Sequence, residues 1–120
     1  MGHVLLTGVD IVEIDRFQSA LARHGRRFLD RVFTPSELRH CRGKTESLAV
    51  RFAAKEATFK ALGRHVGWRA VEVERQDGGK PHMRLHGEAQ ELAERLGIRL
   101  WALSLTHSRL SAVAVVVASD

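Results

Sequence analysis

The stretch TESLAVRFAAKEATFKALG, residues 45–63, carries the strongest helical signal in the chain. It is rich in alanine, contains no internal glycine or proline, and ends at Gly63, a residue type suited to a helix C-cap. We therefore expect one long helix here, with the rest of the fold packed around it.

The polar residues of this helix do not all lie together. On a helical wheel Arg51, Lys55 and Thr58 share one narrow polar stripe, whereas Glu56 and Lys60 lie on a face that otherwise has the pattern of a buried surface. One interpretation of the pair is a helix-surface ion pair worth roughly 0.3–0.5 kcal/mol. The other is a functional pair on a half-buried face.

The residues before this helix predict a strand followed by helices. Residues 4–11 have the pattern of a strand, and from Glu13 the apolar residues change to the three- and four-residue spacing of a helix, which Gly25 interrupts. A second, short helix has a complete start signal, with a cap, a proline at the first helical position and a capping-box acid. These residues are Thr34, Pro35 and Glu37.

The residues after the long helix predict mainly strands. Residues 70–75 alternate apolar and acidic side chains, and DGGK at 77–80 supplies the turn of a hairpin. A helix at 88–96 and strands at 98–106 and 110–118 complete the chain. This order predicts an α+β fold, with a mostly antiparallel sheet packed against one long central helix and shorter helices.

An acid interrupts the first predicted strand. Asp10 lies among β-branched residues in GVDIVEID, residues 8–15. It could cap the helix that begins near Glu13, or face water at a sheet edge. It could also join Glu56 in holding Mg²⁺, which typically takes one or two protein carboxylates and completes its shell with water and substrate phosphate.

Length and composition limit the class of protein. The 120 residues fit one domain, 1–120, and the single cysteine cannot form an internal disulfide. We find no leader pattern and no apolar run of about 20 residues, which predicts a cytoplasmic protein without a membrane partner. The formal charge of +5 favours an anionic partner, which could be a phosphate ester, a nucleic acid or an acidic protein.

Five motifs occur in an order and spacing that resemble those of the short-type 4'-phosphopantetheinyl transferases, the family of the holo-acyl-carrier-protein synthases. The first and third are the most specific, because they combine a strand GxD with KE in a long helix and a lysine four residues beyond the glutamate. The motifs are GVDIVEIDRF at 8–17, RVFTPSEL at 31–38, RFAAKEATFKALG at 51–63, DGGKP at 77–81 and SLTHS at 104–108.

The resemblance implies an activity and an assembly. Members of this family transfer the phosphopantetheine arm of coenzyme A to a serine of apo acyl carrier protein, usually with Mg²⁺, and release adenosine 3',5'-bisphosphate. The reaction serves fatty acid biosynthesis. Members of this length resemble one another in forming homotrimers with active sites at the subunit interfaces.

The resemblance also implies roles for individual residues. Asp10 and Glu56 match the metal ligands, and Lys60 matches a lysine directed to phosphate and to the proton-transfer region. Either Glu56 or a metal-bound water could accept the serine proton. Positions lining the coenzyme A site correspond here to Arg51, Lys60, Gly63, Gly79, Lys80, Pro81 and His107.

A basic ridge on the first predicted helix has two interpretations. It could be a solvated helix face, or it could bind the acidic acyl carrier protein, which the resemblance favours. Its members are Arg16, Arg23 and Arg27, with Arg26 as a further candidate.

Two other functions remain open at this point. A small basic nucleic-acid-binding module fits the charge, but the chain has no tyrosine, no aromatic strand motif and no zinc or recognition-helix pattern. A non-catalytic interaction protein could share the fold, although it would not require the set of Asp10, Glu56 and Lys60. The loop at 64–67 departs from the family pattern, so no family contact is carried over to it.

Overall fold

The computed structural model describes residues 3–75 and 78–120. Part of the predicted hairpin turn, Asp77, lies outside the described residues. The chain forms an α+β fold, as predicted, in the order β1 (Leu5–Glu13), α1 (Ile14–Val32), α2 (Pro35–Cys41), α3 (Thr45–Leu62), a 3-10 turn η1 (Trp68–Ala70), β2 (Val71–Arg75), β3 (Pro81–Leu85), α4 (Gly87–Arg95), β4 (Leu100–His107) and β5 (Ser111–Ser119).

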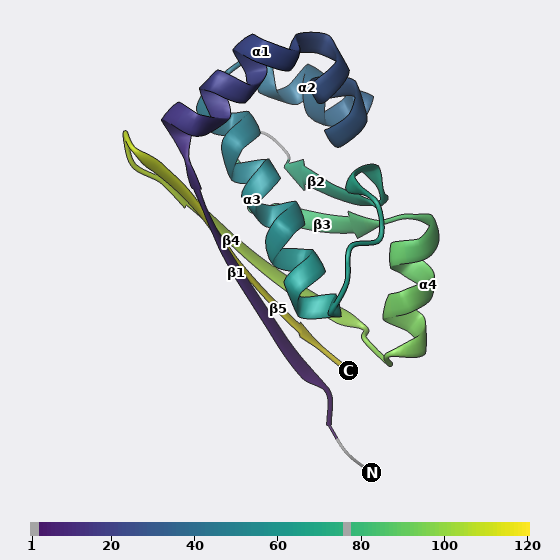
Figure 1. Ribbon diagram of the computed structural model, residues 1–120. Coiled ribbons are helices and arrows are strands. Elements are labelled where there is room, and N and C mark those ends of the chain that lie inside the picture. The colour runs from purple at the N-terminus through teal and green to yellow at the C-terminus, as the bar shows by residue number, and fades with distance from the viewer. Residues whose placement is uncertain (1–2, 76–77) are drawn as a thin grey trace.

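Two antiparallel sheets surround the long helix. The larger has the strand order β1-β5-β4, and the smaller is the β2–β3 hairpin. Helix α3 crosses one face of the larger sheet and also contacts the hairpin, while α1 and α2 lie over the end of α3 where it begins (Figure 1). The predicted long helix is therefore the centre of the fold.

Local sequence signals explain the helix boundaries. The capping box before α2 is present: Thr34 Oγ1 accepts a hydrogen bond from Glu37 N (3.1 Å), and Glu37 Oε1 accepts one from Thr34 N (3.0 Å). Helix α1 is kinked at Gly25, whose φ of 53° is non-helical, and α3 ends at Gly63 with φ of 88°. These positive φ values favour glycine at both positions.

The core between α3 and the larger sheet is built from small side chains. Ala53, Ala54 and Ala57 of α3 are fully buried and pack in one cluster with Ala114 and Val116 of β5. Small residues let helix and strand backbones approach closely. This close packing brings side chains of β1 and α3 within reach of one another.

The opposite face of the larger sheet is apolar and exposed. Leu5, Val9 and Ile11 of β1 are 69%, 56% and 65% exposed, and Val9 pairs with Val115 of β5, which is 41% exposed. Exposed apolar faces of this kind are typical of interaction surfaces. Within the described residues, no helix combines the length and apolarity needed to cross a bilayer.

Candidate active site

Gly8 sets the distance between β1 and α3. A Cβ atom built on Gly8 would lie 1.8 Å from the carbonyl oxygen of Ala57 and 3.2 Å from the amide nitrogen of Ala61. Only glycine leaves room for this approach. Because side chains alternate along a strand, Asp10 shares the inner face of β1 with Gly8 and is turned toward α3.

The carboxylate of Asp10 meets the ammonium of Lys60. Lys60 Nζ lies 3.0 Å from Asp10 Oδ1 and donates a second hydrogen bond, also of 3.0 Å, to the carbonyl oxygen of Val9. The Asp10 side chain is 16% exposed, whereas that of Lys60 is 56% exposed. The cation is therefore open to solvent and the anion is partly enclosed.

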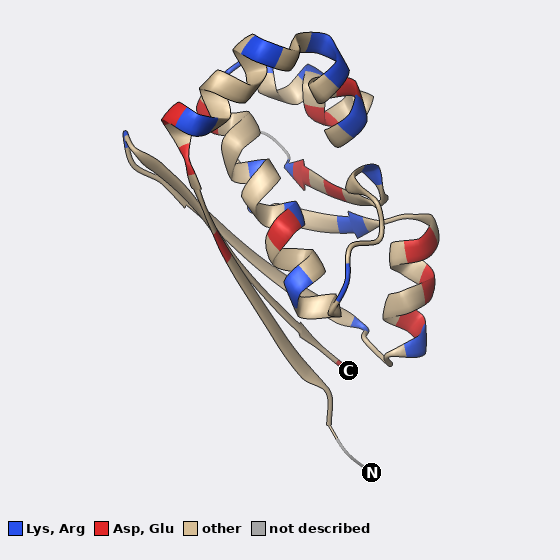
Figure 2. Cartoon of the chain, in the orientation of Figure 1, with Lys and Arg blue, Asp and Glu red and all other residues tan. Residues whose placement is uncertain are grey.

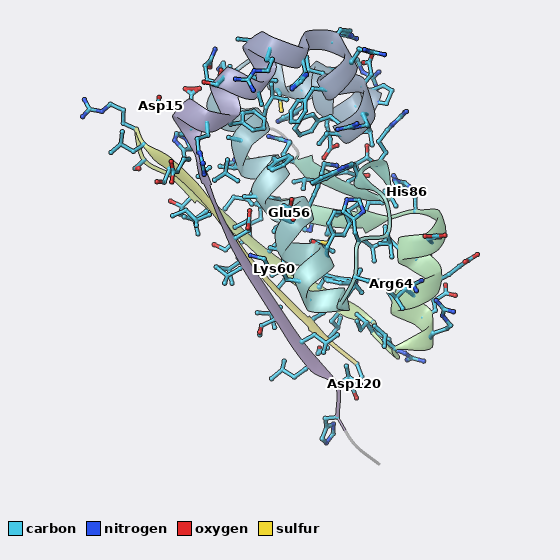
Figure 3. All side chains as sticks on the ribbon, viewed as in Figure 1. Asp15, Glu56, Lys60, Arg64, His86 and Asp120 are labelled. Carbon is cyan, nitrogen blue, oxygen red and sulfur yellow. The ribbon has the colours of Figure 1, made fainter. Side chains whose placement is uncertain are left out.

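Glu56 is the second acid at this place. Burial raises the pKa of Glu56, the negative charge of Asp10 raises it further, and His65 and Lys60 oppose the shift. Glu56 lies one turn before Lys60 on α3, which places it near the Asp10–Lys60 ion pair, although the two acids are 46 positions apart in sequence. Figure 3 shows Glu56 and Lys60 on successive turns of α3, on the side that faces the viewer.

The helical wheel ranked the faces of α3 wrongly. The stripe of Arg51, Lys55 and Thr58 is buried, with exposures of 4%, 0% and 0%. Glu56 is half-buried and Lys60 is exposed, so they lie on the more open side of the helix. The wheel failed because partners from distant segments, which it does not contain, cover the polar stripe.

Lys55 is held by a buried ion pair with Glu37 of α2. Its Nζ donates to Glu37 Oε1 at 2.8 Å and to the carbonyl oxygens of Trp68 and Val71. The other oxygen of Glu37 accepts a hydrogen bond from the amide of Val73 at 2.9 Å. Burial lowers the pKa of Lys55, and the charge of Glu37 opposes that shift.

The Glu37 network extends through a second carboxylate. Thr34 Oγ1 donates to Glu72 Oε2 at 2.6 Å, and the ring nitrogen Nε2 of His86 lies 2.9 Å from Glu72 Oε1. Burial alone would raise the pKa of Glu72, but the hydrogen bonds with Thr34 and His86 outweigh it and hold the pKa below its usual value. The network thus fastens α2, α3 and the β2–β3 hairpin together.

The residues matched to the coenzyme A site lie in several places. Arg51 is buried, its Nη1 donates to Ser47 O at 3.1 Å, and its Nε has no partner within the described residues. Gly63 caps the end of α3. Gly79 and Lys80 directly precede β3, which begins at Pro81, and Gly79 O accepts a hydrogen bond from Arg75 Nε at 3.1 Å.

His107 is at the end of β4, in a shallow pocket that Thr45 and Glu46 also line. This pocket is at the first turn of α3, whereas Gly63 follows its last turn. An 18-residue helix is about 27 Å long at 1.5 Å per residue. A single chain therefore keeps His107 and Gly63 at opposite ends of α3.

The basic ridge lies along α1. Arg16, Arg23 and Arg27 are all exposed, and Figure 2 shows several basic positions along this helix. Arg23 and Arg27 lie on either side of the kink at Gly25. The predicted residues are therefore available to a partner.

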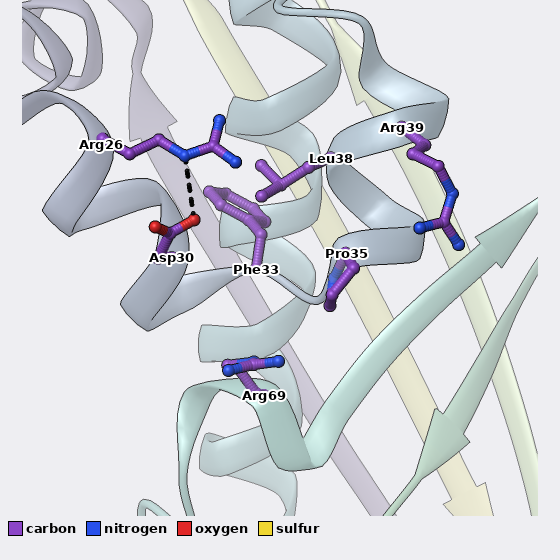
Figure 4. Close-up of a pocket in the computed structure, with 7 residues that line it drawn as sticks. All are labelled: Arg26, Asp30, Phe33, Pro35, Leu38, Arg39 and Arg69. Atoms are coloured by element: carbon purple, nitrogen blue, oxygen red, sulfur yellow. Dashed lines mark ion pairs between the residues drawn. The ribbon is translucent and has the colours of Figure 1, made fainter.

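Sequence reasoning missed a second basic surface next to this helix. Arg26, Arg39 and Arg69 line a pocket over Phe33 and Leu38, where α1, α2 and η1 come together (Figure 4). The pocket forms from three segments separated in sequence, so no local pattern could have indicated it. Arg26 is paired with Asp30, Nε to Oδ1, at 3.2 Å.

His65 is the residue near the acids that sequence reasoning left unassigned. It lies in the loop after Gly63, and its ring packs on Phe59, three residues beyond Glu56 on α3. Within residues 3–75 and 78–120, no group of three or more His, Cys, Asp or Glu side chains forms a metal cluster. The Asp10 and Glu56 pair is the smaller set that Mg²⁺ can use.

Known proteins share both the sequence and the fold. The sequence model of the 4'-phosphopantetheinyl transferase superfamily matches residues 7–113 of this chain. Holo-acyl-carrier-protein synthase of Herpetosiphon aurantiacus is 50% identical over 124 aligned positions, which cover 95% of this chain and 98% of that protein. The synthase of Koribacter versatilis is 45% identical and covers 98% of this chain and 99% of its own.

Solved structures agree with these matches. The crystal structure of the Helicobacter pylori synthase in complex with coenzyme A has a TM-score of 0.85 and 31% identity, over 94% of this chain and 99% of that one. The Bacillus anthracis synthase, in complex with coenzyme A (3',5'-ADP), has a TM-score of 0.80 and 32% identity, over 99% of both chains. This chain is an enzyme of the 4'-phosphopantetheinyl transferase superfamily and belongs with its holo-acyl-carrier-protein synthases.

Proposed function

We propose that this enzyme transfers the 4'-phosphopantetheine group of coenzyme A to a serine of apo acyl carrier protein in the cytoplasm, with Mg²⁺, for fatty acid biosynthesis. The observation that carries the proposal is the meeting of Asp10, Glu56 and Lys60 across β1 and α3. A nucleic-acid-binding module or a non-catalytic protein would not need this set.

The two acids fit a divalent cation. Asp10 and Glu56 place two carboxylates in a partly enclosed site, where burial and the charge of Asp10 together raise the pKa of Glu56. Carboxylate oxygens on rigid elements suit Mg²⁺, and we assign Asp10 and Glu56 as its ligands. Bound there, Mg²⁺ would neutralise charge on the phosphates of coenzyme A.

Glu56 and Lys60 are the proposed catalytic residues. The serine oxygen forms a bond to the β-phosphorus of coenzyme A, and the bond from that phosphorus to the leaving adenosine 3',5'-bisphosphate breaks. Glu56 is the proposed acceptor of the serine proton. Lys60, held by Asp10 and the Val9 carbonyl, contributes positive charge to the phosphates.

Coenzyme A is proposed to bind across two subunits of a homotrimer. The separation of His107 and Gly63 along α3 supports this arrangement, because contributions from neighbouring chains would complete one site. The proposed contacts are Arg51, Lys60, Gly63, Gly79, Lys80, Pro81 and His107. The buried guanidinium of Arg51 keeps one nitrogen without a hydrogen-bond partner within the described residues, which suits an anionic ligand.

The outer face of the larger sheet supports the proposed assembly. Its exposed apolar side chains include Val9 and Ile11, and a trimer would remove them from water. A Val9→Lys variant should therefore sediment as a smaller species and lose transfer activity. Leu96→Lys is the matched control, because Leu96 is an exposed apolar residue (37%) at the end of α4 and is not part of the larger sheet. Equal oligomer size for both variants would reject this surface.

The acidic acyl carrier protein is proposed to bind the ridge of Arg16, Arg23 and Arg27. Opposite charges steer association and set the register of the partner, and they make binding sensitive to salt. The exposure of all three side chains supports this role.

Intact-mass spectrometry tests the proposed reaction directly. Incubation with Mg²⁺ and coenzyme A should add about 340 Da, the phosphopantetheine group, to apo acyl carrier protein. The isosteric variants Asp10→Asn and Glu56→Gln should abolish the gain while circular dichroism shows an unchanged fold. No gain with the unaltered enzyme across several apo carriers would reject the proposed function, and near-normal turnover in both variants would reject the metal site.

A further inference from the structure

His65 is held firmly although it lies in an exposed loop. Its ring packs on Phe59, with centroids 4.1 Å apart and planes at 30°, and meets the ring of Trp68 edge-on at 4.7 Å. Phe59 is buried in the core beside α4, and Trp68 stacks on Phe52 at 4.9 Å. The imidazole is therefore part of an aromatic stack anchored on α3.

A backbone hydrogen bond defines the chemical state of the ring. The amide of Gly67 donates to Nδ1 of His65 at 3.2 Å. Nδ1 must then be unprotonated, so the neutral ring carries its proton on Nε2. Gly67 can present its amide in this way because its φ of 101° is a backbone conformation that favours glycine. His65 consequently offers a hydrogen-bond donor at Nε2.

This donor is next to the proposed reaction centre. Phe59, on which the ring packs, is three residues beyond Glu56 on α3 and directly precedes Lys60. Phe59 covers one face of the ring, Trp68 meets the ring at nearly a right angle, and Gly67 occupies Nδ1, so Nε2 is the remaining polar atom that can meet a ligand.

We propose that His65 binds substrate by donating a hydrogen bond from Nε2 to a phosphate oxygen of coenzyme A, an inference that rests on the proposed function. A donor suits this place because the acids Asp10 and Glu56 cannot bind a phosphate directly without a cation between them. A neutral imidazole adds a directed hydrogen bond there without bringing another permanent charge into the site. Coenzyme A carries phosphates of two kinds, the diphosphate and the 3'-phosphate, and both present the acceptor oxygens required.

Two substitutions separate the donor from the packing of the ring. His65→Phe keeps an aromatic ring on Phe59 and removes the donor, whereas His65→Gln keeps an N–H near the position of Nε2. Calorimetric titration with coenzyme A should show about tenfold weaker binding for His65→Phe, the size of one charge-assisted hydrogen bond, and a loss within about threefold for His65→Gln. Unchanged affinity of the His65→Phe variant would overturn the proposal.

Dephospho-coenzyme A, which lacks the 3'-phosphate, distinguishes the two acceptors. Equal losses of affinity for both ligands in His65→Phe would assign the contact to the diphosphate. A loss confined to coenzyme A would assign it to the 3'-phosphate. In steady-state assays the same variant should raise KM for coenzyme A while leaving KM for the carrier unchanged.

Nitrogen NMR of the imidazole gives a readout that does not depend on turnover. The ¹⁵N shifts of His65 at neutral pH should identify the Nε2–H tautomer, and a Nδ1–H tautomer would overturn the proposal even in an active enzyme. Failure of the proposed function looks different, since the unaltered enzyme would then add no mass to any apo carrier.

Discussion

Replacing Gly8 with alanine tests the contact on which the site depends. The new Cβ would lie 1.8 Å from the Ala57 carbonyl oxygen, and real Cβ atoms essentially never approach another heavy atom closer than 3.0 Å. The contact involves backbone on both sides, so no side chain can turn away to relieve it. Strand β1 and helix α3 must therefore separate by about 1.2 Å or bend locally.

The expected cost follows from this displacement. Adding a methyl group to a well-packed core typically costs about 1–3 kcal/mol, and a forced backbone shift puts Gly8→Ala at the upper end of that range or beyond it. The same shift lengthens the 3.0 Å hydrogen bonds from Lys60 to Asp10 and to the Val9 carbonyl. We expect lower stability together with a loss of transfer activity that exceeds the fraction unfolded.

Urea unfolding and single-turnover transfer measure the two effects separately. Gly43→Ala is the matched control, because Gly43 has a positive φ of 74° but no heavy atom lies within 4 Å of the position that its new methyl group would take. It should lose about 1 kcal/mol from backbone strain and keep its activity. If Gly8→Ala were as stable and as active as Gly43→Ala, close approach of β1 and α3 would not be what holds the site.

Three further substitutions test other parts of the structure. Lys55→Met leaves Glu37 as an uncompensated buried charge, so it should lower stability by about 3–5 kcal/mol and Tm by about 10–20 °C. A loss of less than about 1 kcal/mol in urea unfolding would contradict this. Burial raises the pKa of Glu72, but its hydrogen bonds bring the pKa below the usual value of 4.5. In urea unfolding the unaltered chain should therefore be more stable than Glu72→Gln above pH 4.5. This difference in stability should disappear as the pH falls through the folded-state pKa of Glu72. A constant advantage down to about pH 2 would refute that role. Arg23→Glu should raise KM for the carrier about tenfold without changing KM for coenzyme A, whereas Arg95→Glu on α4 should change neither; equal effects of the two would indicate only general charge repulsion.

Much of the fold was predictable because its signals are local. The Thr34 capping box, the glycine that kinks α1 and the alanine-rich stretch of α3 each fix a conformation within a few residues. Strand alternation and turn residues did the same for the hairpin and for the last two strands. The predicted first strand ended at residue 11, whereas β1 extends to Glu13. The acidic residues there alternate between the two faces of the strand and therefore do not interrupt it.

Parts of the site that involve distant segments were not predictable in the same way. The motif GxD draws attention to Gly8, but its function depends on the position of Ala57, 49 residues later in the chain. The polar stripe of Lys55 could not be recognised as buried until Glu37 was placed opposite it. A wheel ranks faces by polarity alone, and it fails where a buried charge has a partner from another element.

Helix α3 is buried on nearly all sides, so its rotation about its own axis has to be fixed by specific contacts. Because helical neighbours are turned by about 100°, Lys55 and Glu56 leave the axis in different directions although they are adjacent in sequence. Lys55 is fastened to Glu37, Trp68 and Val71. A helix with a single apolar stripe could be oriented by burial alone, but the small residues of α3 are buried against both the sheet and the hairpin, so burial does not select one rotation. We infer that the buried ion pair selects it and that Gly8 sets the depth, so that Lys60 is presented to Asp10.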